Sequence, residues 1–258
     1  ASDVYKRQIA QITEFLNPQI AIVGEIGAQH IEYFKTLENI RATKLEALSS
    51  KRLEKAFVHS STQANDGEKI EIYDKDLSGV EASLDGVKFK LGEREFGSPL
   101  LGKFNAANLA VCVKTALYLG LDEARIASAL ARLKNVEHRL ERIDAGGKII
   151  IDDGFNGNFN GMSASYELVG SYEGRKVLVT PGIMESSDEE NEKLSKIINK
   201  TFDIVMLTSS LNAVALLKHL SRPKVIVIKD KSKLQETLAQ NTKAGDLILF
   251  SNDAPSFI

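Results

Sequence analysis

Apolar residues in the second half of the chain occur in short continuous runs that are separated by amphipathic stretches. The runs predict buried strands, and the stretches between them have the periodicity of helices. The expected strands cover residues 148–151, 176–179, 204–207, 225–228 and 247–250, and the expected helices cover residues 161–170, 189–200, 211–220 and 232–239. Such a βαβ succession predicts a parallel sheet with helices on both faces, which is a complete doubly wound domain.

The first half of the chain has a less regular pattern, which predicts a mixed α/β region. We expect strands at residues 20–23 and 56–59, and helices at residues 36–50, 104–119 and 122–133. Asp122 is the expected N-cap of the last of these helices. Within residues 81–90, Asp85-Gly86 separates two extended runs, which predicts a β-hairpin with a two-residue turn at positive φ.

The change of pattern places a domain boundary between residues 136 and 137. We expect a partial mixed α/β domain over residues 9–136 and the doubly wound domain over residues 137–258. The opening residues 1–8, ASDVYKRQ, resemble translated adapter sequence. We therefore expect a non-native or disordered start there.

Composition excludes several classes of protein. Of 258 residues, 43% are hydrophobic and 26% are charged, which is ordinary for a globular protein with its own core. The formal net charge of −2 provides no basic field for nucleic acid or for an anionic membrane. There is no apolar run of about 18 residues and no signal peptide, and the single Cys112, expected to be buried, excludes an internal disulfide. These features predict a monomeric cytoplasmic protein.

The segment from Gly24 to Glu46 contains two residues with distinctive chemistry, His30 and Lys44. Lys44 falls on or beside the apolar stripe of the helix expected at residues 36–50, so its ammonium must reach outward along its stem or lose its charge. His30 follows the end of an expected strand, where a histidine is either a hydrogen-bonded structural residue or a metal ligand. The two residues by themselves leave these alternatives open.

Three further polar groups lie at the starts of helices or at the domain boundary. Asn105 and Asn108 open a helix, where Asn105 is either an N-cap or, with Asn108, a ligand for an adenine edge. Arg139 is either a surface arginine or a phosphate ligand. Asp153 and Asn156 follow an expected strand, where ligands of parallel sheets gather, but a turn that caps the next helix would have the same composition.

The order of these motifs resembles the Mur ligase family, the ATP-dependent amide ligases of peptidoglycan synthesis. The matching segments are GEIGAQH followed by ATK, then GKFNAANLA, HRLER and IIIDDGFNGNFNG. The resemblance implies that His30 serves a magnesium site and that Lys44 is carbamylated. Reaction of a neutral Lys44 amine with carbon dioxide would turn the side chain into an anionic oxygen ligand for Mg²⁺.

The resemblance also assigns the nucleotide contacts. It implies that Asn108, with Asn105 beside it, contacts adenine and that Arg139 reaches the terminal phosphate of ATP. It implies that Asp153 accepts from the ribose hydroxyls and that Asn156 lies close to the nucleotide. The implied cofactors are therefore ATP and Mg²⁺, and the implied catalytic residues are Lys44, His30 and Arg139.

Residues 152–158 are most similar to the subgroup of the family that adds D-alanyl-D-alanine. Its substrates, UDP-N-acetylmuramoyl-tripeptide, D-alanyl-D-alanine and ATP, are the small-molecule partners that the resemblance implies. The implied reaction passes the γ-phosphoryl group to the substrate carboxylate, and the amine then attacks the acyl phosphate. The resemblance implies an α/β fold in which a truncated central domain of the family precedes a complete Rossmann-like C-terminal domain.

The phosphate-binding pattern G-x-x-x-x-G-K-[ST] does not occur in the 258 residues. We therefore expect the isolated chain to be an inactive fragment. Three alternatives remain open: a folylpolyglutamate synthase or another Mur ligase, a catalytically silent nucleotide-binding module, and a regulatory protein built on a decayed ligase.

Overall fold

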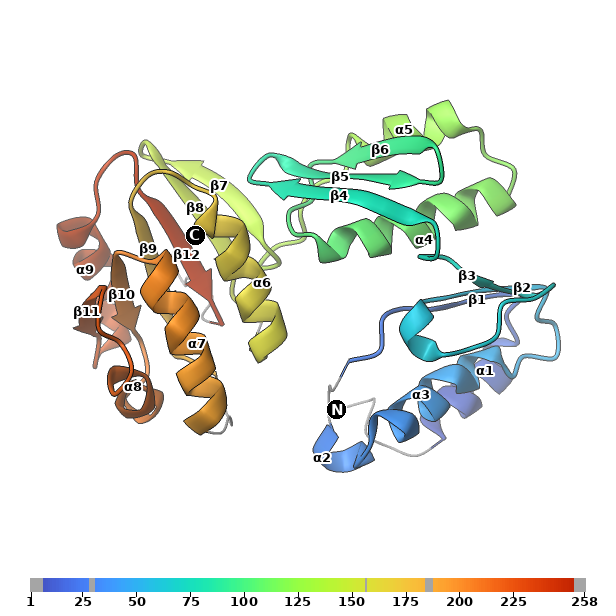
Figure 1. Cartoon of the computed structure of the whole chain (residues 1–258), viewed down its shortest axis with the longest axis horizontal. Coiled ribbons are helices and arrows are strands. Elements are labelled where there is room, and N and C mark those ends of the chain that lie inside the picture. The colour runs from blue at the N-terminus through green and yellow to red at the C-terminus, as the bar shows by residue number, and fades with distance from the viewer. Residues whose placement is uncertain (1–6, 28–30, 156, 184–187, 253–258) are drawn as a thin grey trace. The chain divides into compact units, whose positions relative to one another are not determined.

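The computed structural model describes residues 7–27, 31–155, 157–183 and 188–252 (Figure 1). His30 and Asn156, two of the predicted site residues, therefore lie outside the described residues. The chain forms two compact units, and each is considered by itself. The first comprises Ala1–Val80, Lys88–Phe96 and Phe104–Leu130, and the second comprises Glu81–Val87, Gly97–Lys103 and Ala131–Ile258.

A parallel three-stranded sheet lies at the centre of the first unit. Its order is β1-β2-β3, and its strands are β1 (Ile20–Val23), β2 (Lys55–Val58) and β3 (Ile70–Ile72). Alternate residues of β1 and β2 form an apolar core with Ala47 and Leu48 on one face of this sheet. The two strands predicted in this region are confirmed, whereas β3 was not predicted.

The helices of the first unit are α1 (Gln8–Leu16), α2 (Ile31–Phe34), α3 (Leu37–Leu45), α4 (Phe104–Tyr118) and α5 (Glu123–Leu130), with 3₁₀ turns η2 (Glu46–Leu48) and η3 (Ser60–Thr62). The three helices predicted in the first unit are present as α3, α4 and α5 with shorter boundaries, whereas α1 and α2 were not predicted. Asp122 caps α5 as predicted, because its Oδ1 accepts from the Arg125 amide at 2.9 Å. The prediction of a buried Cys112 is wrong, since this residue lies outside the buried stripe of α4 and is exposed.

The predicted hairpin is present, but its turn lies one residue earlier than expected. Strands β4 (Leu77–Ser83), β5 (Gly86–Leu91) and β6 (Arg94–Ser98) form a sheet in the order β4-β5-β6. Leu84 and Asp85 make the turn, and Gly86 opens β5 with φ of 132°. A Cβ on Gly86 would lie 2.1 Å from the Ser98 carbonyl oxygen, so this position requires glycine.

The tip of this hairpin belongs to the second unit. Arg142 Nη1 donates to the Leu84 carbonyl oxygen at 2.9 Å and to Asp85 Oδ1 at 3.0 Å. Arg142 itself lies in β7 (Glu141–Ala145), an edge strand that pairs antiparallel with β8 (Lys148–Asp153) and was not predicted. The hairpin tip is thus fixed by one arginine of the second unit's sheet.

The six-stranded sheet of the second unit has the order β11-β10-β9-β12-β8-β7. Its parallel strands are β8, β9 (Lys176–Thr180), β10 (Ile204–Leu207), β11 (Lys224–Val227) and β12 (Leu247–Ser251). All five were predicted as apolar runs, and four of them, β8, β9, β10 and β12, are largely buried, as strands covered on both faces are expected to be.

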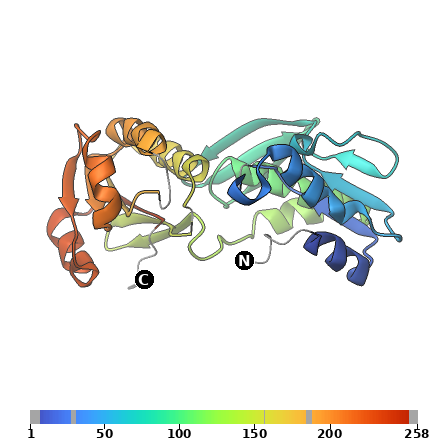
Figure 2. The same cartoon turned by 90° about the horizontal axis from the view of Figure 1, so that it is seen from below.

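Helices cover both faces of this sheet, as predicted (Figure 1). Helices α6 (Phe159–Gly170), α7 (Asp188–Thr201) and α8 (Ser210–Leu217) contribute to the core on one face, and α9 (Leu234–Asn241), after the 3₁₀ turn η4 (Lys231–Lys233), packs on the other. Figure 2 shows the yellow and orange helices α6 and α7 on the opposite side from the red helix α9. The chain reverses direction across the sheet after β11, and right-handed crossovers then require α9 to change face.

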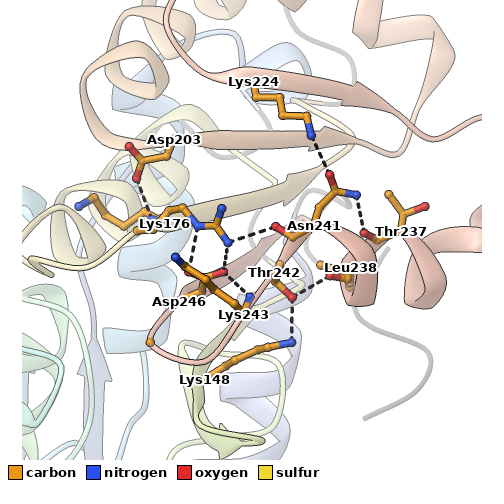
Figure 3. Close-up of polar contacts among 12 residues, drawn as sticks. Lys148, Lys176, Asp203, Lys224, Thr237, Leu238, Asn241, Thr242, Lys243 and Asp246 are labelled. Carbon is orange, nitrogen blue, oxygen red and sulfur yellow. Dashed lines mark hydrogen bonds and ion pairs between the residues drawn. The ribbon is translucent and has the colours of Figure 1, made fainter.

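A dense polar network closes the amino end of this sheet (Figure 3). The Asp246 side chain is 1% exposed and receives Arg175 Nε at 2.9 Å and Arg175 Nη2 at 2.6 Å. The Lys243 amide donates to the same carboxylate at 2.8 Å. Burial opposes ionisation of Asp246, but these donors hold its pKa below the usual value. Asp246 therefore remains a carboxylate, and it connects the loops before β9 and β12.

Candidate active site

Two aspartates end strand β8 at the carboxyl edge of the second sheet. Asp152 is fully buried, and Asp153 is 3% exposed. Because neighbouring residues of a strand point to opposite faces, Asp153 lies on the same face as Ile151 and α6, and Asp152 lies on the other. The Asn252 amide donates to the Asp153 carbonyl oxygen at 3.1 Å. Ligands of parallel α/β sheets gather at this edge, which makes it the candidate site of the second unit.

His138 joins the segment before β7 to this edge. Its Nδ1 lies 2.7 Å from Asp152 Oδ2, and Asp152 Oδ1 accepts from the Gly154 amide at 3.0 Å. The hydrogen bond to Asp152 raises the pKa of His138. His138 and Leu140 have φ of 60° and 50°, a left-handed conformation that non-glycine residues rarely adopt. The sequence interpretation assigned no role to His138, although it precedes Arg139 in the HRLER motif.

Arg139 reaches the loop that follows the two aspartates. Its Nη1 donates to the Phe155 carbonyl oxygen at 2.9 Å, and its guanidinium carbon lies 5.8 Å from the centre of the Phe155 ring. The His138 ring contacts the same phenylalanine edge-on, with ring centres 5.0 Å apart. Both Arg139 and Phe155 are exposed. The structure thus brings together Arg139 and the aspartate loop, which the sequence identified as separate motifs.

Buried polar side chains lie beneath this edge. Asn252, at the end of β12, donates through Nδ2 to the Gly182 carbonyl oxygen at 3.0 Å, and the Gly182 amide donates to Thr180 Oγ1 at 3.1 Å. Tyr166 of α6 is fully buried, and burial raises its pKa, so its hydroxyl stays protonated. Asn252 therefore joins the ends of β8 and β9. No local pattern in the sequence indicates this role, because the contacts are all tertiary.

The two predicted adenine ligands lie in the first turn of α4 in the first unit. Asn108 Nδ2 donates to Asn105 Oδ1 at 3.3 Å, so the two amides form a pair. Asn108 is exposed and Asn105 is half-buried. The alternative that Asn105 is an N-cap is wrong, because α4 already begins at Phe104. This hydrogen bond uses one N–H of the Asn108 amide. The Oδ1 atom and the second N–H of Asn108 take no part in the bond to Asn105.

Lys44 is helical as predicted, but it is the penultimate residue of α3, which ends five residues before the predicted helix does. It is half-buried and lies one turn after the buried Ile40, beside the apolar stripe. His30 is outside the described residues, so its predicted pairing with Lys44 stays a prediction. Within the described ranges, no group of three or more His, Cys, Asp or Glu side chains could hold a metal ion.

Comparison with known proteins identifies the family. The Mur ligase middle domain matches residues 2–116, and the domain described as "Mur ligase, glutamate ligase domain" matches residues 138–252. The chain belongs to the Mur ligase family. Members of this family are ATP-dependent ligases, and the family resemblance predicted from the sequence motifs is confirmed.

Several relatives carry the same name. The UDP-N-acetylmuramoyl-tripeptide–D-alanyl-D-alanine ligase of Bacillus subtilis is 28% identical over 267 residues, a match that covers 95% of this chain and 58% of the relative. The enzyme of that name from Escherichia coli is 25% identical over 206 residues, covering 72% and 45% of the two chains. The matches thus span only about half the length of these curated relatives.

Solved structures support the fold. The MurF ligase of Thermotoga maritima in complex with ADP has a TM-score of 0.74 and 24% identity, and the match covers 97% of this chain and 62% of that one. The corresponding ligase of Acinetobacter baumannii has a TM-score of 0.80 and 20% identity, with coverage of 95% and 58%. The predicted α/β fold of Mur-ligase middle and C-terminal domains is therefore confirmed. No helix in the described part of the chain is long and apolar enough to cross a membrane.

Proposed function

We propose that this chain is part of an ATP-dependent amide ligase that adds D-alanyl-D-alanine to UDP-N-acetylmuramoyl-tripeptide. One observation carries the proposal. Arg139 and the loop after Asp153, each matched separately to the family in the sequence, are in direct contact through the 2.9 Å hydrogen bond to the Phe155 carbonyl oxygen. The similarity to the UDP-N-acetylmuramoyl-tripeptide–D-alanyl-D-alanine ligase of Bacillus subtilis supports the choice of substrate.

The residues of the second unit suit the sugar and phosphate parts of ATP. A carboxylate at Asp153 would accept hydrogen bonds from the ribose hydroxyls, and Asn156 would lie close to the nucleotide. Arg139 uses one of its five N–H groups on Phe155, which leaves donors for a phosphate oxygen. Because a guanidinium does not lose its proton at neutral pH, Arg139 would stabilise the charge that develops during phosphoryl transfer.

The residues of the first unit suit the adenine and metal parts of the chemistry. Asn108, held by Asn105, would present a donor and an acceptor to the adenine edge. The carboxylates and imidazoles of the described residues supply no three-ligand set, so Mg²⁺ would depend on phosphate oxygens, on His30 and on a carbamate of Lys44. When bound, the ion would neutralise phosphate charge.

Titration of the 258-residue chain with magnesium and ATP tests the nucleotide part of the proposal. Asp153→Asn removes the charged acceptor and keeps the size of the side chain, so we expect the affinity to fall about tenfold or more. Asp230→Asn is the matched control, because Asp230 is an exposed aspartate that caps η4. An unchanged affinity in Asp153→Asn would contradict the ribose assignment, and no binding by the unmodified chain would contradict the nucleotide site itself.

Amide formation is tested separately. We propose that the chain alone does not ligate, because the phosphate-binding pattern does not occur in its 258 residues. Ligation of D-alanyl-D-alanine to the tripeptide precursor is measured by product formation with the chain alone and with a polypeptide that adds the phosphate loop. Product formed by the chain alone would overturn the proposed inactivity. Faster reaction with another amine, such as D-glutamate or a diamino acid, would overturn the substrate.

A further inference from the structure

A cluster of polar side chains lies at the carboxyl edge of the first unit's sheet. His59, Ser60 and Ser61 follow β2, and Asp74 follows β3. Ser61 Oγ is 2.8 Å from His59 Nδ1, and His59 Nε2 is 3.3 Å from Asp74 Oδ2. The contacts run from serine to histidine to aspartate, as in the catalytic triad of nucleophilic hydrolases. The hydrogen bonds around them indicate a different role.

The oxygen of Ser61 is already held by two neighbours. The Ser61 amide also donates to His59 Nδ1, at 3.1 Å, so this nitrogen is an acceptor and Nε2 carries the proton that faces Asp74. The Ser61 hydroxyl therefore donates to Nδ1, while its oxygen accepts from the Ile26 amide at 2.8 Å. Asp74 accepts in addition from the Ser60 amide at 2.8 Å and the Ser60 hydroxyl at 2.6 Å. Such a saturated network holds its members in place.

Ser61 joins two segments that are far apart in the sequence. Its hydroxyl binds Ile26, in the segment that follows β1, and its carbonyl oxygen accepts from Arg41 Nε of α3 at 2.9 Å. Arg41 and Lys44 are three residues apart and therefore lie on neighbouring positions of one helix face. One residue thus connects the end of β1 to the helix that carries Lys44.

We propose that Ser61 is a positioning residue for Lys44. The inference rests on the proposed function, in which the carbamate of Lys44 is a magnesium ligand. A ligand on a short helix must be held to within about 0.5 Å, and this requires support from a second layer of hydrogen bonds. His59 and Asp74 fix the Ser61 hydroxyl, Ser61 fixes Arg41, and Arg41 fixes the turn of α3 that leads to Lys44.

The first test measures Lys44 directly, without nucleotide or metal. The rate at which an acylating reagent modifies Lys44 is followed by mass spectrometry, with the exposed Lys51 as the internal reference. Ser61→Ala removes the hydroxyl and leaves the carbonyl oxygen, and we expect about threefold or greater change in the rate at Lys44 relative to Lys51. Arg41→Ala breaks the same connection from the helix side and should give a change of the same sign.

Ser49→Ala is the matched control, because within the described ranges the Ser49 hydroxyl donates to the Glu46 carbonyl oxygen of the preceding turn and to no other residue. Ser61→Thr keeps a hydroxyl and should restore the rate of the unmodified chain, whereas a purely structural loss of packing would not be rescued by it. An unchanged Lys44 rate in both Ser61→Ala and Arg41→Ala would overturn the inference, whether or not the chain binds nucleotide.

The second test separates the inference from the proposed function. The ratio of ATP affinities with Mg²⁺ and with EDTA isolates the contribution of the metal, and we expect Ser61→Ala to reduce this ratio about tenfold. A ratio of one in the unmodified chain would contradict the proposed metal chemistry, while the Lys44 rate would still decide the role of Ser61. A magnesium-dependent ratio that is equal in the unmodified chain and in Ser61→Ala would overturn the positioning role.

Discussion

The two ends of the second unit's sheet are built from the same strands but differ in their polar chemistry. At the amino end, Asp246 is buried and every described partner around it is part of the fold (Figure 3). At the carboxyl end, Asp152 is equally buried, but its network leads to the exposed Arg139 and Phe155. We therefore expect the amino end to serve stability, and we propose that the carboxyl end presents groups to a ligand.

The two networks also have opposite electrostatic character. Donors hold the pKa of Asp246 below its usual value, so the pair with Arg175 requires a charged carboxylate. The carboxylate of Asp152 raises the pKa of His138, so this pair is strongest when the histidine is protonated. Acid should therefore weaken the amino end first, and alkali the carboxyl end.

The largest effect is expected from Arg175→Ala at the amino end. This substitution leaves the buried Asp246 carboxylate without its bidentate partner, which costs about 3 kcal/mol of the free energy of unfolding. The estimate is at the low end for a buried pair, because Arg175 is partly exposed and the Lys243 amide still donates to Asp246. Denaturant unfolding of the two proteins measures the difference.

A surface ion pair of the same unit provides the control. Lys193 and Glu189 are four residues apart on α7, with their charged atoms 2.7 Å apart and both side chains exposed. Lys193→Ala should lower the free energy of unfolding far less than Arg175→Ala does, because water and salt screen an exposed pair. If Arg175→Ala costs no more than Lys193→Ala, the amino end does not serve stability in the way that its burial suggests.

At the carboxyl end, Arg139→Ala should affect ligand binding and leave stability nearly unchanged. Arg139 is exposed, so the free energy of unfolding should stay within about 0.5 kcal/mol. Loss of a charged donor to phosphate should lower the affinity for ATP about tenfold. Arg139→Lys should recover only part of this affinity, because an ammonium lacks the planar fork. Equal affinities in all three proteins would contradict a phosphate contact.

The pH dependence of stability should distinguish the two ends within one protein. Because the folded pKa of His138 is raised, its pair with Asp152 contributes stability below the unfolded value of about 6.5, and the contribution is lost as pH rises through the folded pKa. The folded pKa of Asp246 is lowered, so its contribution is present above about 3.9 and is lost as pH falls through the folded pKa. A plot of the free energy of unfolding against pH should therefore fall at both ends, in an acid limb and an alkaline limb.

Single substitutions show which pair of residues causes each loss of stability. Asp152→Asn should remove the loss at the alkaline side and leave the acid side unchanged, and Arg175→Ala should do the reverse. His219→Asn is the control for a histidine that is exposed on the surface of the same unit. An alkaline limb that persists in Asp152→Asn would show that another group is responsible.

The sequence predicted the body of the second unit well, because buried parallel strands such as Ile204–Leu207 are continuous apolar runs. It failed at β7, whose sequence ERIDA mixes charged and apolar residues, as an edge strand permits. It also failed at β3, which is only three residues long. Strand prediction from pattern therefore succeeded for continuous apolar runs, including the edge strand β11, and failed for strands that are very short or of mixed composition.

The candidate site could be predicted only in part. Arg139 and Asp153 stand in recognisable motifs, but their proximity depends on the left-handed conformations of His138 and Leu140, which no local preference favours. Asn252 and Ser61 have no motif, and their roles come entirely from tertiary hydrogen bonds. The motifs indicated the chemistry, and the fold supplied the residues that hold it.

The smallest effect, and the sharpest test of the comparison, is expected from Phe155→Ala at the carboxyl end. The side chain is 60% exposed, so its removal should change the free energy of unfolding by less than about 0.5 kcal/mol. It contacts both Arg139 and His138, and an exposed cation–π contact contributes about 0.5–1 kcal/mol. We therefore expect the affinity for ATP to fall about two- to fivefold, since Arg139 keeps its hydrogen bond to the backbone but loses the ring that orients it. Phe15→Ala, at a more exposed phenylalanine of α1, should leave the affinity unchanged, and an equal loss in both variants would mean that the Phe155 ring does not orient Arg139.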